Sequence, residues 1–330
     1  MKAWVQDRYG SADALEFREV DTPVPREHEV LVRVRAASVN ARDWHLMRGD
    51  PYVARPALGL RRPRERIRGT DFAGVVTAVG GGVSRFRPGD EVFGESGGAF
   101  AEYVCAAQDV VERRPAGLGY EEAAAIPLAG NTALMGLRDL GRLRSGDKVL
   151  VNGASGGVGT FAVQLGKAYG AEVTGVCSTR NAELVRGLGA DRVLDYTRED
   201  FTKGPERYDL LLDLVGNRSL AEYRRVLTPA GRLVLSGGGV FEGGSLIGPL
   251  GLIVQGQLAS LFTGGRIRVL TAEPRRENLA TLRELAETGA IVPVVERTYP
   301  LAEADRALRY VEGEHPRAKV VLSCPPPSGP

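Results

Sequence analysis

The stretch KVLVNGASGGVG at residues 148–159 decides the fold, because an apolar run leads directly into a glycine-rich turn that opens an amphipathic helix. A lone glycine motif is weak evidence, but a preceding strand and a following helix are what a dinucleotide-binding turn requires. The glycines let the backbone approach a pyrophosphate, whose charge is met by N–H groups at the helix start. The motif predicts a cofactor site made by Gly153, Ser155, Gly156, Gly157, Val158 and Gly159.

The motif departs from the usual G-x-G-x-x-G at its first glycine, where this chain has Ala154 with Gly153 just before it. We expect Gly156 to allow close approach of a ligand and Gly159 to allow tight packing of the helix on the sheet. The alternative is a glycine-rich turn between strand and helix that binds nothing.

The regions around the motif alternate between apolar runs and helical segments, which predicts a doubly wound parallel sheet. The runs are nearly continuous in apolar residues, as is typical of strands covered on both faces. We expect strands at residues 148–151, 172–177, 192–195, 209–213, 232–236 and 267–270, and intervening helices at 159–169, 182–188 and 219–227.

The first 115 or so residues are punctuated by Gly and Pro between short β-branched runs, which predicts a β-rich unit. We divide the chain into a β-rich domain at residues 1–120 and a cofactor domain at 121–271. After residue 272, a helix at 275–288, a strand at 291–299, a helix at 301–312 and a strand at 318–322 end the chain.

The end of the second strand of the predicted sheet indicates which nucleotide is bound. An NAD enzyme usually has Asp or Glu about 20 residues after the glycine turn, where the carboxylate binds the ribose hydroxyls. Residues 177–180 read CSTR, so Ser178 supplies a hydroxyl and Arg180 a guanidinium that suits a 2′-phosphate. The sequence therefore predicts NADPH; the alternative is that Arg180 is a solvated residue at a helix start.

Composition argues against several other classes of protein. A net charge of +2 with interspersed acids and bases gives no basic face for nucleic acid. The late apolar stretch at 246–262 is interrupted by Pro249 and two glutamines, so we expect it to line a pocket and not to span a membrane. No basic-then-apolar leader opens the chain, which favours a cytosolic location with reduced thiols.

Catalysis by a metal is also disfavoured by the sequence. The histidines are His28, His45 and His315, and the cysteines are Cys105, Cys177 and Cys324. None of these forms the paired Cys and His spacing that zinc sites use. Direct hydride transfer then remains, in which the cofactor is the reactive group and the protein orients the substrate.

Several motifs together resemble the medium-chain dehydrogenase/reductase superfamily, and specifically its zinc-independent quinone oxidoreductase and enone reductase branch. The resemblance covers nearly the whole chain through ASVNARDW at 37–44, GTDFAGVV at 69–76, RPGDEVFG at 87–94, PLAGNTAL at 127–134, NGASGGVG at 152–159 and RAKVVL at 317–322. It implies a GroES-like first domain, a Rossmann second domain, a substrate site between the two, a return of residues 272–330 to the first domain, and often a homodimer.

The resemblance also implies roles for individual residues. Where zinc-dependent relatives carry a Cys this chain has residues 38–40, and where they carry His-Glu it has Thr70 and Asp71. Asn40 should face the nicotinamide and substrate, and Trp44, His45 and Tyr52 fall where relatives line the substrate pocket. Cofactor contacts are implied at Thr132, Tyr196, Val215, Gly216, Ser236, Gly237 and Lys319.

These features predict hydride transfer from NADPH to a small-molecule acceptor, either a quinone or an α,β-unsaturated carbonyl compound. One alternative is reduction of an enoyl thioester, which the basic run at residues 61–68 favours, although that run is also typical of a solvated loop. Another is an NADPH-binding redox sensor without turnover. His45 is a candidate proton donor or a packed histidine.

Overall fold

The computed structural model describes residues 1–236, 256–257, 265–314 and 316–324. The chain divides into two compact units. The first contains Met1–Asn131, Glu273–Gly289 and Pro293–Pro330, and the second contains Thr132–Ala272 and Ala290–Val292. The predicted pocket-lining stretch at 246–262 lies outside the described residues apart from Gly256 and Gln257, as do Gly237 and His315.

The first unit is β-rich and built on a mainly antiparallel sheet. Its strand order is β14-β15-β3-β4-β5-β7, with β6 paired to β3, and a separate two-stranded sheet joins β1 to β2. The bounds are β1 Lys2–Gln6, β2 Leu15–Glu19, β3 Glu29–Val39, β4 Asp71–Val79, β5 Glu91–Glu95, β6 Tyr103–Ala107, β7 Val111–Arg113, β14 Val295–Pro300 and β15 Lys319–Ser323.

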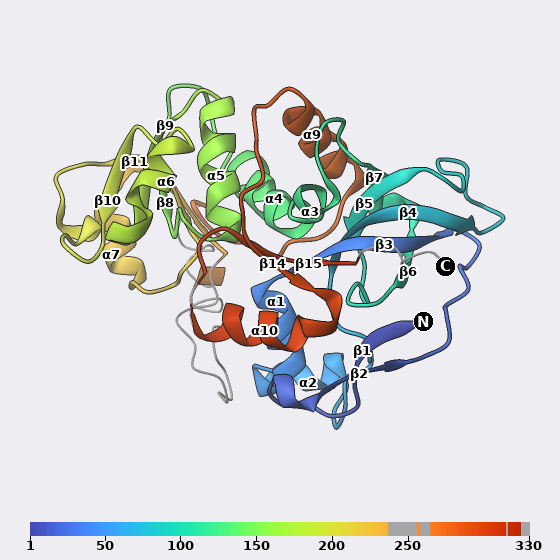
Figure 1. Cartoon of the computed structure of the whole chain (residues 1–330). Helices are drawn as coiled ribbons and strands as arrows, with labels where there is room; N and C mark the ends of the chain where they lie inside the picture. Colours follow the sequence, from blue (N-terminus) through green and yellow to red (C-terminus); the bar gives the residue numbers. More distant parts are fainter. Residues whose placement is uncertain (237–255, 258–264, 315, 325–330) are drawn as a thin grey trace. The chain divides into compact units, whose positions relative to one another are not determined.

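The last part of the chain completes this first sheet. Strand β15 pairs antiparallel with β3, with Val320 opposite Val39 and Val321 opposite Ser38. Figure 1 shows β14 and β15, in red, beside β3, in blue. The pairing places Lys319, at the start of β15, next to the end of β3.

The helices of the first unit are short. They are η1 Ala12–Ala14, α1 Ala41–Arg48, η2 Tyr52–Ala54, α2 Arg55–Leu58, η3 Gln108–Val110, α3 Tyr120–Ala124, α4 Pro127–Leu134, α9 Arg276–Glu287, η7 Leu301–Glu303 and α10 Ala304–Gly313. The first unit extends past residue 120 because α3 packs on β3 and β4. At its end, Asn131 donates to the carbonyl oxygen of Glu273 and accepts from Asn278.

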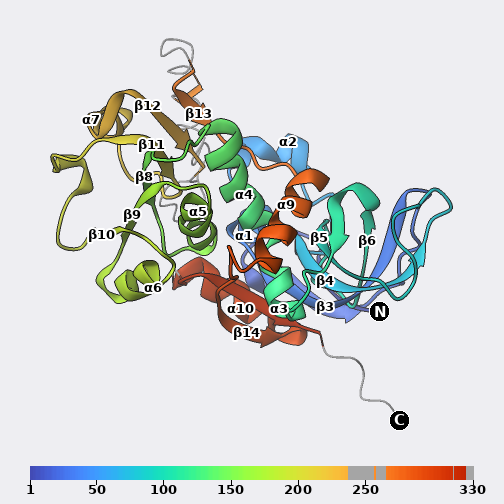
Figure 2. The ribbon, with the colours of Figure 1, turned by 90° about the horizontal axis from the view of Figure 1, so that it is seen from above.

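The second unit is a six-stranded parallel sheet in the order β10-β9-β8-β11-β12-β13, as Figure 2 shows from above. The bounds are β8 Lys148–Asn152, β9 Glu172–Cys177, β10 Arg192–Asp195, β11 Tyr208–Asp213, β12 Leu227–Leu235 and β13 Ile267–Val269. Its helices are η4 Met135–Leu140, α5 Gly157–Ala168, η5 Thr179–Asn181, α6 Ala182–Gly187, η6 Phe201–Lys203 and α7 Leu220–Arg225.

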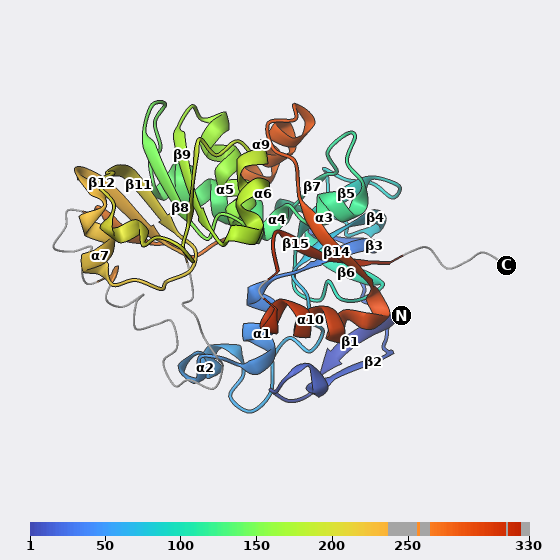
Figure 3. The ribbon, with the colours of Figure 1, turned by 60° about the vertical axis from the view of Figure 1, so that its left-hand side comes forward.

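Helices cover both faces of this sheet. Figure 3 shows α5 on one side of the strands and α7 on the other. Leu150 and Leu211 pack in one cluster with Tyr223 of α7, while Leu212, the next residue along β11, lies against Gly136 of the π-helical turn η4. The sheet is therefore doubly wound, which confirms the predicted fold class.

None of the helices in the described part of the chain has the length and apolar character needed to cross a membrane.

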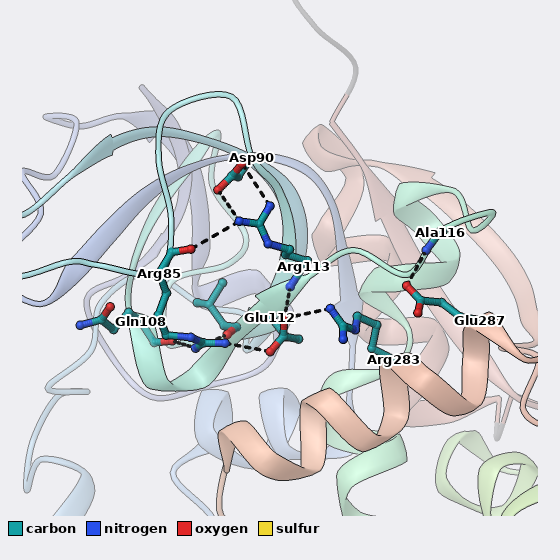
Figure 4. A network of polar contacts seen from close by, with 9 residues as sticks. Arg85, Asp90, Gln108, Glu112, Arg113, Ala116, Arg283 and Glu287 are labelled. Atoms are coloured by element: carbon teal, nitrogen blue, oxygen red, sulfur yellow. Dashed lines mark hydrogen bonds and ion pairs between the residues drawn. The ribbon is translucent and has the colours of Figure 1, made fainter.

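An ion-pair network ties α9 to the first unit. The buried carboxylate of Glu112 in β7 accepts from Arg85 at 2.8 Å and lies 3.5 Å from a guanidinium nitrogen of Arg283 in α9. Figure 4 shows both guanidinium groups pointing at this carboxylate, and also Glu287 of α9 accepting from the backbone N–H of Ala116. One carboxylate thus neutralises two partly buried cations.

We predict that Glu112→Ala lowers the free energy of unfolding by about 2–3 kcal/mol, since both guanidinium groups lose their carboxylate while partly buried. The matched control is Glu287→Ala on the same helix, where an exposed side chain makes a single bond and the cost should be below about 0.5 kcal/mol. Denaturant unfolding of the two variants measures the difference, and equal costs would contradict this role for Glu112.

Candidate functional site

The predicted cofactor residues of the second unit gather at the carboxyl ends of its parallel strands. Strands β9 and β10 lie on one side of β8, and β11, β12 and β13 lie on the other, so the winding reverses between β8 and β11. Open parallel sheets bind ligands at such a reversal. The structure brings to this edge Gly153, Ser155, Gly156, Gly157, Val158 and Gly159 after β8, Ser178 and Arg180 after β9, Tyr196 after β10, Val215 and Gly216 after β11, and Ser236 after β12.

Three glycines shape the turn after β8 in different ways. Gly153 has a φ of 91°, which is in the left-handed region that favours glycine. A Cβ at Gly159 would lie 2.1 Å from the carbonyl oxygen of Gly153, so only glycine lets α5 start this close to the strand. A Cβ at Gly156 would meet no atom nearer than 3.5 Å, which leaves the backbone there open to a ligand.

The departure at Ala154 is accommodated by the neighbouring strand. Ala154 is buried, and its N–H donates to the carbonyl oxygen of Val176 at 3.0 Å. A Cβ at Gly175, in β9, would approach the Ala154 methyl group to 3.0 Å. The absence of a side chain at Gly175 therefore makes room for the methyl group at Ala154.

A buried asparagine that the sequence analysis missed joins the loops after β8 and β9. The Nδ2 of Asn181 donates to Ser155 Oγ at 3.0 Å and lies 3.4 Å from Ser178 Oγ. Both serines are predicted cofactor ligands, so Asn181 fixes the hydroxyl of Ser155 in place beside the second loop. The only signal in the sequence is its position one residue after Arg180.

The corner predicted to bind the adenosine ribose contains a carboxylate after all. Arg180 is exposed, and Tyr196 has 56% of its surface accessible. Asp195 ends β10 and accepts from the Thr179 hydroxyl and from Thr197, and these bonds hold its pKa below the usual range. Tyr196 was predicted at this corner but its neighbour Asp195 was given no role, because an acid was expected only at the end of β9. The parallel pairing of β10 with β9 brings Asp195 alongside that end.

The turn after β11 is held by a buried acid, Asp213. Its carboxylate accepts from the backbone N–H of Gly216 at 3.0 Å, from that of Val215 at 3.3 Å and from Asn152 Nδ2 at 2.8 Å. Burial raises the pKa of Asp213. Asn152 ends β8 directly before the glycine turn, so this bond connects two of the predicted cofactor loops. At the next strand, the N–H of Ser236 donates to the carbonyl oxygen of Asp213.

In the first unit, three buried polar residues surround the predicted substrate residue Asn40. Its Oδ1 accepts from Lys319 Nζ at 2.5 Å, and its Nδ2 donates to Asp71 Oδ2 at 3.0 Å and to the carbonyl oxygen of Ser38 at 3.3 Å. Asp71 also accepts from the Ser38 hydroxyl and from the N–H of Leu128. The Asn40 amide therefore has a fixed orientation, and both of its N–H groups are already used.

Lys319 belongs to this cluster, although the resemblance implies a cofactor contact for it. Only 3% of its surface is exposed, and its Nζ lies 3.7 Å from Asp71 Oδ2. Burial lowers the pKa of Lys319 and raises that of Asp71, while each charge favours the charged form of the other. The lysine thus holds Asn40 in place and neutralises Asp71.

Two further carboxyl groups of this unit have raised pKa values. Asp43, near the start of α1, accepts from the N–H of Asn40 and from the Thr70 hydroxyl, each at 2.8 Å, and burial raises its pKa to about 6. Glu95 accepts from Arg42 at 2.9 Å, and burial together with the charge of Asp71 raises its pKa to about 7. Both groups can therefore exchange protons near neutral pH.

The other predicted pocket residues are Trp44, His45 and Tyr52. Trp44 is buried and its ring stacks on that of His45, with 3.6 Å between ring centroids. Burial lowers the pKa of His45, which favours a neutral ring. Tyr52 is 41% exposed and lies under the guanidinium of Arg55. Thr132, for which the resemblance implies a cofactor contact, is buried in α4, at the start of the second unit.

The donor set around Asn40 does not fit zinc. The cluster consists of amide, hydroxyl, carboxylate and ammonium groups, whereas zinc sites are built mainly from thiolate and imidazole ligands. The lysine cation bound directly to Asn40 would also repel a metal ion. Within the described ranges, no group of three or more His, Cys, Asp and Glu residues is arranged to hold a metal ion.

Comparisons with known proteins identify the family of the chain. Residues 26–116 match the alcohol dehydrogenase GroES-like domain, and residues 188–322 match the zinc-binding dehydrogenase family. The chain is 35% identical over 360 residues to the mitochondrial NAD(P)H oxidoreductase RTN4IP1 of Mus musculus, covering 98% of this chain and 89% of the relative. It is 32% identical to the chloroplast envelope quinone oxidoreductase homolog of Arabidopsis thaliana, covering 95% of each chain.

The fold also matches a solved structure. The quinone oxidoreductase from Coxiella burnetii superposes with a TM-score of 0.84 at 28% identity, covering 98% of this chain and 99% of that one.

Proposed function

Because the chain belongs to the medium-chain dehydrogenase/reductase superfamily, in its branch of zinc-independent quinone oxidoreductases, we propose that it transfers hydride from NADPH to a quinone or an α,β-unsaturated carbonyl compound without zinc. The relatives establish the coarser statement that it is an NAD(P)H-dependent oxidoreductase. The observation that carries the finer proposal is the gathering of the glycine turn, Ser178, Arg180 and Tyr196 at one edge of the parallel sheet.

The residues at this edge suit each part of the dinucleotide. The open backbone at Gly156 and the N–H groups that start α5 suit the pyrophosphate. Ser178 and Arg180 suit a 2′-phosphate, and the exposed ring of Tyr196 suits the adenosine end. When bound, NADPH supplies the hydride.

In the first unit, the proposed role of the protein is to orient the acceptor and supply a proton. Asn40 is held rigidly by Lys319 and Asp71, so it can present a fixed polar surface. Protons can come from Asp43 or Glu95, whose pKa values of about 6 and 7 keep a protonated fraction near neutral pH. His45 is a weaker proton donor, since burial favours its neutral form.

We also propose that the acceptor is a small molecule, that the protein forms a homodimer and that it is located in the cytosol. The three cysteines are free thiols, as expected in a reducing compartment. The relatives named above carry mitochondrial and chloroplast locations in their own names, so the location needs its own measurement in cells.

The direct test is NADPH oxidation with a panel of quinones, enones and enoyl-CoA thioesters. Turnover with quinones or enones supports the proposal, and turnover with enoyl-CoA alone would favour the thioester reductase. Tight NADPH binding without oxidation by any acceptor would favour a redox sensor instead.

The preference for NADPH gives a second prediction. Arg180→Ala should raise the KM for NADPH by about tenfold and leave the KM for NADH nearly unchanged, since only NADPH has the 2′-phosphate. Asp195→Asn is the matched variant at the same corner, and removing its negative charge should lower the KM for NADPH. Steady-state kinetics with each cofactor measure these KM values. If Arg180→Ala changes the KM for NADPH and the KM for NADH equally, the basis for the predicted NADPH preference is removed.

A further inference from the structure

Arg68 differs from the rest of the basic run at residues 61–68. Arg61, Arg62, Arg64 and Arg66 are exposed, whereas only 5% of the surface of Arg68 is accessible. A solvated loop explains the exposed arginines but not a buried one. The buried position needs a partner that compensates the cost of taking a guanidinium out of water.

Among the described residues, no such partner is present for Arg68. Its guanidinium makes no hydrogen bond or ion pair with them, and its buried Nε is without an acceptor. The other buried cation of the described chain, Lys319, has both Asn40 and Asp71. Among the acids, Asp43 has the largest effect on the pKa of Arg68, and its two oxygens already accept from Asn40 and Thr70.

Arg68 lines a cavity of about 150 Å³ that lies entirely within the first unit. The cavity reaches Thr70 and Asp43, which adjoin the Asn40 cluster. Its polar and charged lining consists mainly of Arg42, Asp43, Glu65, Arg68, Thr70 and Glu95. A buried cation with unused donors thus faces a space large enough for a small chemical group.

The charges of the side chains that line the cavity indicate which chemical group can bind in it. Three carboxyl groups, Asp43, Glu65 and Glu95, share the wall with two guanidinium groups, so a permanent anion would meet repulsion. A carbonyl oxygen is neutral when it binds and gains negative charge only as hydride adds to the conjugated carbon. Donors placed at such an oxygen stabilise the transition state more than the ground state.

We propose that this cavity is the subsite for the carbonyl oxygen of the acceptor, and that Arg68 donates hydrogen bonds to that oxygen. The inference rests on the proposed function and adds a substrate contact to it. Bound NADPH would supply a hydride to the β-carbon of the enone and leave as NADP⁺. The electron pair of the C=C bond would then give an enolate oxygen whose charge Arg68 stabilises, and a proton from Asp43 or Glu95 would add to the α-carbon.

The test compares Arg68→Met with Arg62→Met, which removes an exposed arginine from the same run. Arg68→Met should lower kcat/KM for 2-cyclohexenone by about 100-fold, as expected for loss of one donor to an oxyanion. Its Kd for NADPH should stay within about twofold, and its Tm should be unchanged or higher because no bond within the protein is lost. Arg62→Met should behave as the wild type.

Two outcomes would overturn the inference, both for an Arg68→Met protein that folds. One is a near wild-type kcat/KM, and the other is a lowered Tm and weaker NADPH binding together with lost activity, as expected for a structural residue. If Arg68→Met does not fold, Arg68→Lys decides. This variant keeps one charge but fewer donors, and it should bind NADPH normally with kcat/KM reduced by about tenfold; an unchanged kcat/KM would overturn the inference.

Binding without cofactor separates this inference from the proposed function. If none of the acceptors supports NADPH oxidation by the wild type, the reductase proposal fails. Titration of the NADPH-free protein with 2-cyclohexenone then tests the cavity alone. Binding by the wild type that weakens at least about tenfold in Arg68→Met, and not in Arg62→Met, supports the subsite. Equal binding by all three proteins, or none, overturns it.

Discussion

The turn after β8 depends on the contact between the backbone of Gly159 and the carbonyl oxygen of Gly153. Because a side chain at Gly159 would collide with that oxygen, only glycine lets α5 begin directly above the end of its strand. The first N–H groups of α5 then face the edge at which the neighbouring parallel strands also end. Asp213 and Asn181 fix the adjacent loops, so the whole edge is ordered around this turn.

In the first unit, charged side chains are buried beside the predicted substrate residue, Asn40. Lys319, on the last strand, reaches Asn40 and Asp71 because β15 pairs with β3. Buried charges are costly unless they are paired, and Lys319 and Asp71 are paired in this way. Arg68 breaks the pattern, since it is buried without such a partner among the described residues, and this is why we infer a ligand there.

Features encoded within one stretch of sequence were predictable, and features made by distant residues were not. The strand, glycine turn and helix at residues 148–159 are contiguous, and the apolar runs gave the parallel strands to within a few residues. The bond from Asn152 to Asp213, the approach of Asp195 to Thr179 and the pairing of Lys319 with Asn40 depend on strand order. Periodicity carries no information about strand order, so these contacts and the burial of Arg68 needed the structure.

The central claim is that a pyridine dinucleotide lies across the glycine turn, and equilibrium binding of NADPH to Gly156→Val tests it most directly. The backbone at Gly156 is extended, and a Cβ there would meet no atom nearer than 3.5 Å, so the variant should fold as the wild type does. We predict that the wild type binds one NADPH per chain and that the variant binds at least about tenfold more weakly. A well-folded variant with unchanged affinity, or a wild type that binds no pyridine nucleotide, would contradict the account.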